Sequence, residues 1–319
     1  MNKYKLSIII PHYNSSKLLE KLLSTIPQYK DIQRIVVDDK SKIEDIEYIK
    51  TLHSKYDFEL YINDTEKKGA GVARNIALEK VKGKWILFAD SDDYFTDNFY
   101  ESVSKYFDSD NDVVFFKATS IYIDTKEEAD RHLNFVNILD SYIRNSGIKE
   151  ELSLRYNLPG PISKMVKTKF IQKNKIKFDE IIASNDVMVS IKVGYYMNRF
   201  TVCNKIIYII TKNKGSLTTN TSEKIFDIRF NTIINMIKFL RNKLTKEELK
   251  LLNISRYGRN ILIKSVRYGI FKFIKTLFLL FKNRIGFFHY KLLNPFHIFI
   301  KTKRLFEKNK IELKYQIDE

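Results

Sequence analysis

Cysteine is nearly absent from this chain of 319 residues, and the presence of Cys203 alone excludes two structural features. One thiol cannot build an intrachain disulfide framework, and it fits a reducing cytoplasm. Zinc sites made of paired cysteines are excluded for the same reason. The remaining composition, 44% hydrophobic and 29% charged, is that of a globular protein with one large domain or two smaller ones.

Long apolar runs are also missing. No segment of eighteen or more residues is free of charge, so we expect no membrane-spanning helix. The N-terminal run "LSIII" ends at Pro11. That run is too short for the core of a signal peptide, and it predicts a buried first strand instead.

Acidic residues are absent from residues 249–306, an interval that carries 13 Lys and Arg. Residues 223–319 hold 22 Lys and Arg against 8 Asp and Glu, a net charge of +14. The chain as a whole carries +18, so the first 222 residues carry only +4. A nearly neutral body and a basic tail therefore need separate explanations.

The body alternates strand-like and helix-like patterns up to about residue 115. Apolar runs that end in polar residues predict strands, and apolar residues at helical spacing predict the helices between them. This alternation predicts an α/β fold with a parallel, doubly wound sheet, which binds ligands at the carboxyl ends of its strands. The strands are expected at residues 6–11, 34–39, 58–64 and 84–90, and the helices at residues 15–26, 43–56 and 69–81.

Carboxylates recur where the predicted strands end. They are Asp38 and Asp39 after the second strand, and Asp90, Asp92 and Asp93 after the fourth. Carboxylate oxygens that converge on one sheet edge suit Mg²⁺ or Mn²⁺. Each group alone would also fit a solvated turn or a helix N-cap, with Asp93 or Thr96 as the cap. The second carboxylate pair favours a metal site.

The motifs "SIIIPHYN", "IVVDDKS" and "GAGVARNIALEKVKGKWILFADSDD" resemble, in order and spacing, those of glycosyltransferase family 2. The resemblance continues through residues 162–218 and covers roughly residues 4–220. It implies a GT-A-type nucleotide-binding sheet flanked by helices over residues 1–222. In that domain the nucleotide-sugar half would span about 1–117 and the acceptor half about 118–222. A mainly helical basic region, residues 223–319, would follow.

The same resemblance suggests which residues bind the donor. Pro11, Tyr13 and Asn14 match residues that hold the nucleoside. Asp39 matches the carboxylate that accepts from the imide N–H of the base, and Asp90 resembles the carboxylate that binds the ribose.

Gly69, Gly71 and Arg74 belong to the glycine-rich start of the third predicted helix. The two glycines would let the backbone approach closely, and the fork of the guanidinium suits a phosphate or a base carbonyl. The alternative is a plain turn with Arg74 in a surface ion pair. A dinucleotide-binding fingerprint is disfavoured, because "GAGVARN" lacks the third glycine.

Metal binding and base catalysis are also implied by the resemblance. Asp92 matches the metal ligand, and Mn²⁺ or Mg²⁺ would neutralise charge on the leaving nucleoside diphosphate. Asp186 matches the base that deprotonates the acceptor hydroxyl for an inverting displacement. The family usually has Glu-Asp there, whereas this chain has Asn185 first. Asp186 as a helix N-cap is the alternative, with Asp179 and Glu180 as fallback bases.

The basic tail, residues 260–305, alternates aromatic and aliphatic residues with Lys and Arg. An in-plane helix on anionic lipid would explain this pattern, with Phe271, Phe273, Leu277, Phe278 and Phe281 in the acyl boundary. A helical cap on the catalytic domain, or a homo-oligomer contact, is the alternative. Nucleic-acid binding is disfavoured by the high Phe, Leu and Ile content.

The expected function is therefore that of an inverting, metal-dependent glycosyltransferase. It would move sugar from a nucleotide sugar, with a UDP sugar expected, to a glycan or lipid-linked acceptor in bacterial surface polysaccharide synthesis. We expect a cytoplasmic protein, peripheral on the inner face of the membrane. The alternative is a non-catalytic basic protein that binds nucleic acid or anionic surfaces. The five histidines, His12 among them, lack ligand spacing, and we interpret them as surface or structural residues.

Overall fold

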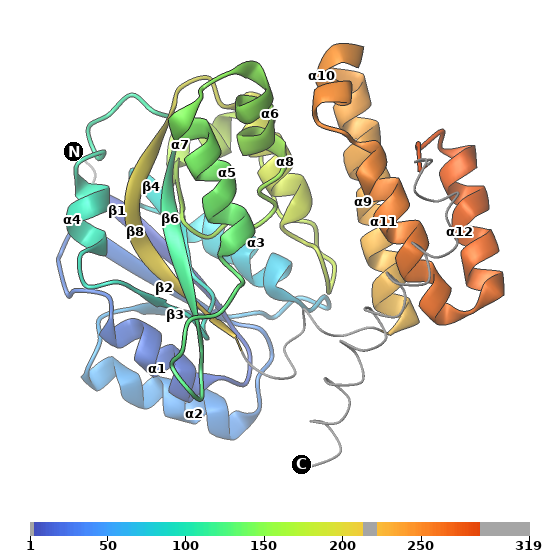
Figure 1. The fold of residues 1–319 in the computed structure, drawn as a ribbon. Coiled ribbons are helices and arrows are strands. Elements are labelled where there is room, and N and C mark those ends of the chain that lie inside the picture. Colours follow the sequence, from blue (N-terminus) through green and yellow to red (C-terminus); the bar gives the residue numbers. More distant parts are fainter. Residues whose placement is uncertain (1–2, 213–221, 288–319) are drawn as a thin grey trace. The chain divides into compact units, whose positions relative to one another are not determined.

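The computed structural model describes residues 3–212 and 222–287, and the chain divides into two compact units, Met1–Lys212 and Asn213–Glu319 (Figure 1). Each unit is described by itself. The domain boundary that we predict after residue 222 stays a prediction, because residues 213–221 lie outside the described residues.

The first unit is built on an eight-stranded mixed sheet with the order β3-β2-β1-β4-β7-β6-β8-β5. The first four strands along the chain are parallel, as predicted. β7 is antiparallel to β4 and β6, whereas β6 and β8 run parallel. The strands are β1 (Leu6–His12), β2 (Ile32–Asp38), β3 (Glu59–Ile62), β4 (Trp85–Phe88), β5 (Tyr94–Phe95), β6 (Val113–Tyr122), β7 (Lys164–Lys167) and β8 (Phe200–Lys212).

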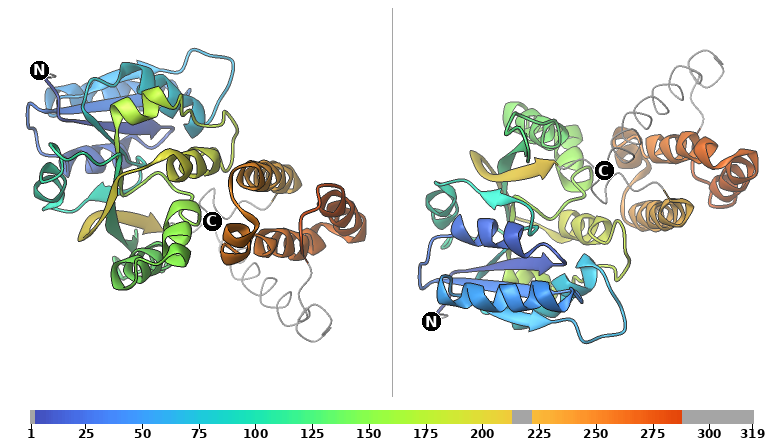
Figure 2. Two further views of the ribbon diagram at one scale, coloured as in Figure 1. Left: turned by 90° about the horizontal axis from the view of Figure 1, so that it is seen from above. Right: turned by 90° about the horizontal axis from the view of Figure 1, so that it is seen from below.

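Helices cover both faces of this sheet, and two apolar clusters fill the space beneath them (Figures 1 and 2). Ile8 and Ile10 of β1 join the cluster under α1, α2 and α4, whereas Ile9 joins the one under α3 and α5–α8. Burial on both faces is why the parallel strands are continuous apolar runs. The helices are α1 (Ser16–Ser24), α2 (Ile43–Thr51), η1 (Leu52–Ser54), α3 (Ala70–Lys80), α4 (Phe99–Ser104), α5 (Leu133–Arg144), α6 (Ile148–Tyr156), α7 (Thr168–Lys173) and α8 (Val187–Tyr196).

The register of the parallel strands brings their carboxyl ends together. His12 of β1 lies opposite Asp38 of β2, and Phe88 of β4 lies opposite Ile9 of β1. The loops that follow β1, β2 and β4 therefore leave the sheet at one edge, which is where the predicted donor and metal residues are found.

The second unit is helical over its described part, residues 222–287. Its long first helix is capped by the Ser222 hydroxyl, which accepts from the N–H of Ile225 at 3.3 Å. Within residues 3–212 and 222–287, none of the helices combines the length and apolar character needed to span a bilayer. The elements are α9 (Glu223–Lys243), α10 (Lys246–Leu251), α11 (Ser255–Ser265), η3 (Val266–Tyr268) and α12 (Ile270–Lys282).

Lys164 is a buried cation in the first unit, 4% exposed, at the start of β7. Its Nζ donates to the carbonyl oxygen of Leu158 at 2.5 Å and to Ser190 Oγ at 3.5 Å. Burial lowers the pKa of Lys164 to about 7, although the charge of Asp186 opposes that change. Folding therefore releases a proton from this lysine above neutral pH.

We expect the Lys164→Met variant to lose part of the pH dependence of stability. The folded pKa lies below the unfolded value, so this group makes the free energy of unfolding rise between about pH 7 and pH 10, by at most about 1.4 kcal/mol per pH unit. Urea denaturation at pH 7, 8 and 9 measures the slope. The control is Lys167→Met, at a half-exposed position of the same strand, which should keep the wild-type slope. An unchanged slope in Lys164→Met would contradict the prediction.

Candidate active site

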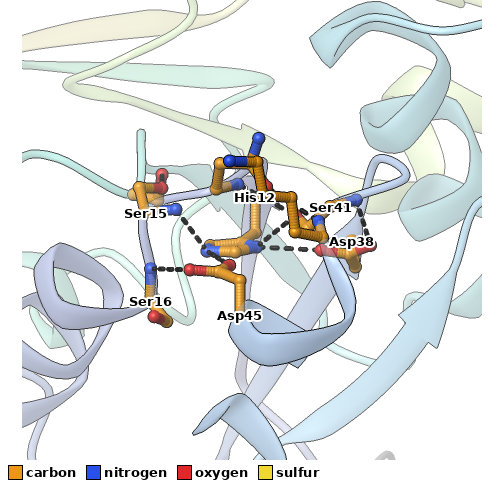
Figure 3. Close-up of polar contacts among 9 residues, drawn as sticks. His12, Ser15, Ser16, Asp38, Ser41 and Asp45 are labelled. Carbon is orange, nitrogen blue, oxygen red and sulfur yellow. Dashed lines mark hydrogen bonds and ion pairs between the residues drawn. The ribbon is translucent and has the colours of Figure 1, made fainter. Parts of the chain in front are cut away.

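His12, at the end of β1, is enclosed between two carboxylates (Figure 3). Its Nδ1 lies 3.0 Å from Asp38 Oδ1, and its Nε2 lies 3.2 Å from Asp45 Oδ2. The backbone N–H of Ser15 donates to Nε2 at 3.1 Å, which places the proton of a neutral ring on Nδ1, where it donates to Asp38. The histidine is 1% exposed, so it is structural, and not a surface residue.

This cluster secures the ends of β1 and β2. Asp38 Oδ2 also accepts from the N–H of Ser41 at 3.0 Å. Burial raises the pKa of Asp38, but the hydrogen bonds from His12 and Ser41 outweigh burial and lower it overall. Asp38 and Asp39 are 0% and 4% exposed, so the solvated-turn alternative for this pair is wrong.

His12, Asp38 and Asp45 have ligand-type atoms within 4.8 Å of one another, as a metal site would require. The imidazole, however, stands between the carboxylates, with one of them at each ring nitrogen. Both ring nitrogens already have partners in the protein, Nδ1 in Asp38 and Nε2 in the N–H of Ser15, and we interpret the cluster as a link between the ends of β1 and β2. Sequence reasoning missed it because residues on different elements have no common spacing.

Asp39 joins three elements at the predicted donor site. Its Oδ1 accepts from Asn63 Nδ2 at 2.7 Å, and its Oδ2 accepts from the N–H of Gly69 at 2.7 Å. Gly69 stands at the N-cap position of α3 with φ +131°, a conformation that a residue with a Cβ rarely adopts. The carboxylate thus fixes the entry of α3 at the ends of β2 and β3.

The loop after β1 holds the other predicted nucleoside residues. Pro11 is buried in the sheet opposite Val37. Tyr13 is 48% exposed, with Lys68 Nζ 3.6 Å from the ring centroid. Asn14 Oδ1 accepts from the N–H of Lys42 at 2.8 Å, which ties this loop to the one after β2. The N–H of Asp39 donates to the carbonyl oxygen of His12 at 2.8 Å, so the exposed Tyr13 directly follows a residue that contacts the buried Asp39.

Arg74 is buried within α3, 6% exposed, and its fork joins two distant segments. Nη2 lies 2.6 Å from Asp90 Oδ1, after β4, and Nη1 donates to Asn185 Oδ1 at 2.9 Å, before α8. The Phe178 ring lies 5.3 Å from the guanidinium carbon. The surface ion pair considered as the alternative is therefore wrong, because Arg74 forms a buried bridge.

The three aspartates after β4 have different environments. Asp93 Oδ1 accepts from the N–H of Thr211 in β8 at 2.7 Å, and burial raises the Asp93 pKa well above its usual value. The N–H of Asp90 donates to the Tyr208 hydroxyl at 2.8 Å. The N-cap position of α4 is Asn98, so the capping alternative for Asp93 and Thr96 is wrong.

Asp92 is the carboxylate of this turn that lacks a counter-charge in contact. Burial raises its pKa, and the neighbouring Asp90 raises it further. The backbone N–H of Asp92 itself and the charge of Arg131 lower the pKa in part, but the net change is upward, and within the described residues the Asp92 carboxylate forms no ion pair. A divalent cation would relieve this repulsion, and carboxylates are the ligands that Mg²⁺ and Mn²⁺ prefer. The donor set at Asp90 and Asp92 therefore fits such an ion.

Asp186 occupies the N-cap position of α8, but its carboxylate makes no capping hydrogen bond. Burial raises its pKa, and although Arg74 and Lys164 lower it, the net change is upward. The pKa of Glu180 is instead lowered by hydrogen bonds from Lys67 and Asn75. A raised pKa suits a general base at neutral pH, so Glu180 is the weaker candidate of the two.

A glycine allows the segment that carries Asp186 to lie against α3. A Cβ at Gly71 would stand 2.3 Å from the carbonyl oxygen of Asp179 and 2.9 Å from Asn185 Cβ. We expected the glycines to allow a close approach of the backbone. Gly71 does so, and the segment that approaches it belongs to the chain itself.

Burial also raises the pKa of Asp179, which leaves Asp179 as the alternative base.

Comparison with known proteins gives several related sequences. The family model "Glycosyl transferase family 2" matches residues 7–168, just over half of the chain. The poly(ribitol-phosphate) beta-N-acetylglucosaminyltransferase TarS of Staphylococcus aureus is 26% identical over 221 residues, 66% of this chain and 36% of TarS. A poly(ribitol-phosphate) beta-glucosyltransferase of Bacillus spizizenii is 40% identical over 96 residues, 28% of this chain and 15% of that protein. The chain thus spans about a third or less of these relatives.

Solved structures show the same fold. The crystal structure of S. aureus TarS 1-349 in complex with UDP-GlcNAc has a TM-score of 0.65 at 20% identity, over 99% of this chain and 92% of that one. The mannosyltransferase PcManGT of Pyrobaculum calidifontis, in complex with GDP-Man and Mn²⁺, has a TM-score of 0.54 at 15% identity, over 86% and 74%. These likenesses confirm the predicted fold class, a GT-A-type sheet with a helical C-terminal region.

The family model, the ordered motifs and the fold agree, and the non-catalytic alternative does not account for them. The predicted family is therefore confirmed: the chain belongs to glycosyltransferase family 2, whose members are nucleotide-sugar glycosyltransferases.

Proposed function

We propose that this glycosyltransferase moves a sugar from a UDP sugar to a hydroxyl of a glycan or lipid-linked acceptor during the synthesis of a bacterial surface polymer. The names of two relatives support this proposal, because both act on poly(ribitol phosphate). A TarS structure with UDP-GlcNAc supports the choice of uridine. The reaction takes place in the cytoplasm at the inner face of the membrane, where a lipid-linked acceptor would lie.

The observation that carries the proposal is the Arg74 bridge. By joining Asp90 to Asn185, it sets the aspartates after β4 beside Asp186, the residue that follows Asn185. The charge of Asp90 raises the pKa of Asp186, which agrees with this placement. A donor held at Asp90 would thus have a base within its own site.

In this proposal the nucleoside lies between the loops after β1 and β2. Each oxygen of the Asp39 carboxylate already accepts one protein hydrogen bond, and each retains capacity for another, such as the imide N–H of uracil. The exposed Tyr13 ring offers an apolar face to the base. Asp90, whose side chain is 41% exposed, can accept from a ribose hydroxyl.

Asp92, with Asp90 beside it, would hold Mn²⁺ or Mg²⁺. Such an ion, when bound, neutralises charge on the departing diphosphate. Asp186 takes the proton of the acceptor hydroxyl, whose oxygen bonds to the anomeric carbon as the bond to the diphosphate breaks. A base on the side opposite the leaving group gives inversion. Arg74 and Lys164 favour the ionised form of Asp186, the form that accepts a proton.

The first test is donor binding. A thermal shift with UDP, and with UDP sugars, should appear only when Mn²⁺ or Mg²⁺ is present. Hydrolysis of a panel of nucleotide sugars then identifies the sugar. If no nucleoside diphosphate raises the melting temperature under any metal condition, the proposed function is wrong.

The Asp92→Asn substitution should abolish the metal-dependent part of donor binding, because the neutral amide removes a charged ligand from the cation. Titration calorimetry with UDP and Mn²⁺ measures the loss. Asp97→Asn, at an exposed position of the same segment, is the matched control and should bind like the wild type. Wild-type affinity in Asp92→Asn would refute the assignment.

For Asp186→Asn we expect donor affinity to survive while sugar transfer falls by about two to four powers of ten, the usual scale for a lost general base. Single-turnover transfer and UDP binding are measured on the same preparation. Asp179→Asn is the comparison, since it removes the alternative base. A larger loss of transfer in Asp179→Asn would move the base to that residue, and an equal loss of donor affinity and transfer in Asp186→Asn would indicate a structural role.

A further inference from the structure

α12 in the second unit buries polar side chains and exposes phenylalanines. Its inward face includes Lys272 and Thr276, 7% and 1% exposed. Its outward face carries apolar residues at helical spacing, which we name the α12 stripe: Phe271, Ile274, Phe278 and Phe281, with exposed fractions of 87%, 54%, 62% and 76%. The inward face also buries Leu280, 0% exposed, but four exposed large apolar side chains depart from the usual arrangement, in which the apolar face of a helix is buried.

Two ion pairs of the buried Lys272 and the burial of Leu280 accompany this orientation of the helix. Lys272 Nζ lies 2.8 Å from Glu223 Oε1 and 2.6 Å from Asp227 Oδ1, both in α9. The inward face packs beside α11 (Figure 1). Rotating α12 to bury the phenylalanines would break these ion pairs, whose carboxylates are 59% and 47% exposed, and would bring Leu280, now 0% exposed, toward water. The outward phenylalanines are therefore part of the folded unit.

The exposed phenylalanines of the described residues all lie in α12. Among the phenylalanines of residues 3–212 and 222–287, those of the α12 stripe are the ones with exposed side chains. A contiguous apolar surface of this kind marks an interaction site.

The charges beside the stripe indicate which partner it meets. Lys275, Lys282 and Arg284 are exposed within the same helix and just after it. The interval 249–306 holds no acidic residue. Glu223 and Asp227, the two acidic residues of α9, are paired with Lys272. The surface thus combines an apolar centre with charges of one sign, which complements an anionic bilayer.

We propose that the α12 stripe inserts into the acyl boundary of an anionic phospholipid membrane, with Lys275, Lys282 and Arg284 at the headgroups. α12 has 13 residues, a length of about 20 Å, and therefore lies in the plane of the interface and does not cross it. The contact residues differ from those predicted from sequence: Ile274 replaces the half-buried Phe273 and Leu277, and Lys272 is buried in ion pairs. Residues 288–305 of the predicted region lie outside the described residues.

The proposal deepens the proposed function, because it supplies the contact that would bring the enzyme to a lipid-linked acceptor. The binding itself requires no catalysis, so it can be tested alone. Full-length protein is sedimented with vesicles of phosphatidylglycerol and phosphatidylcholine, and with vesicles of phosphatidylcholine only, at low and high salt. UDP binding is measured in parallel as a separate test of the active site.

The test variant is Phe271→Gln/Phe278→Gln/Phe281→Gln. Its partition onto anionic vesicles should fall at least about 100-fold, while UDP binding stays at the wild-type level. Ile143→Gln/Ile148→Gln is the matched control, because it removes exposed apolar residues from the first unit and should keep vesicle binding. Lys275→Gln/Lys282→Gln should weaken binding at low salt and lose that effect at high salt.

Three outcomes would overturn the proposal. The wild type could ignore anionic vesicles at low salt. The triple variant could still bind vesicles like the wild type. Finally, the wild type could fail to bind vesicles while sedimentation velocity shows that the triple variant loses self-association or unfolds. Loss of self-association would assign the stripe to contact with a second copy, and unfolding would assign it to packing within the chain. If the wild type binds anionic vesicles but does not bind UDP, the proposed function is refuted and the membrane contact remains supported.

Discussion

The buried guanidinium of Arg74 holds the candidate active site together. It contacts Asp90 after β4 and Asn185 before α8, and no backbone pairing joins those segments directly. Removing Asp90 would leave a guanidinium that is 7% exposed without its counter-charge, and the 41% exposure of Asp90 keeps the cost below the roughly 3–5 kcal/mol of a fully buried pair. The hydrogen bond from Arg74 to Asn185 also holds the Asp179–Asn185 segment against α3, where the segment packs closely on Gly71. The relative position of the proposed donor site and the proposed base thus depends on one side chain.

Charge balance follows from this arrangement. The turn after β4 and the start of α8 bring together Asp90, Asp92, Asp93 and Asp186, and the pKa values of the last three are raised. Arg74 offsets part of that negative charge, and the proposed cation would offset more. Asn185, where the family usually has glutamate, accepts from Arg74 without adding another carboxylate. The guanidinium therefore remains available to Asp90.

The first half of the fold could be predicted from sequence because its strands are buried on both faces, so each is an apolar run that ends in polar residues. The rest of the sheet was harder to predict from sequence, because β5 has two residues, β7 has four, and much of β8 is partly exposed. At the site, the family motifs supplied the residues, whose roles stay predictions. They could not supply the contacts of His12 with Asp38 and Asp45, or of Asp93 with Thr211, because these join elements far apart in sequence.

The anchoring of the aspartate turn by β8 has a consequence for biosynthesis. Thr211 follows Asp93 by 118 residues and is the penultimate residue of the last strand of the first unit. During translation the parallel strands β1 to β4 leave the ribosome long before β8, and such distant pairings form slowly. The nascent chain can therefore form much of its nucleotide-binding half while the turn with Asp90 and Asp92 is still unanchored. Nucleotide sugar and metal would then be captured only once the whole first unit has been synthesised.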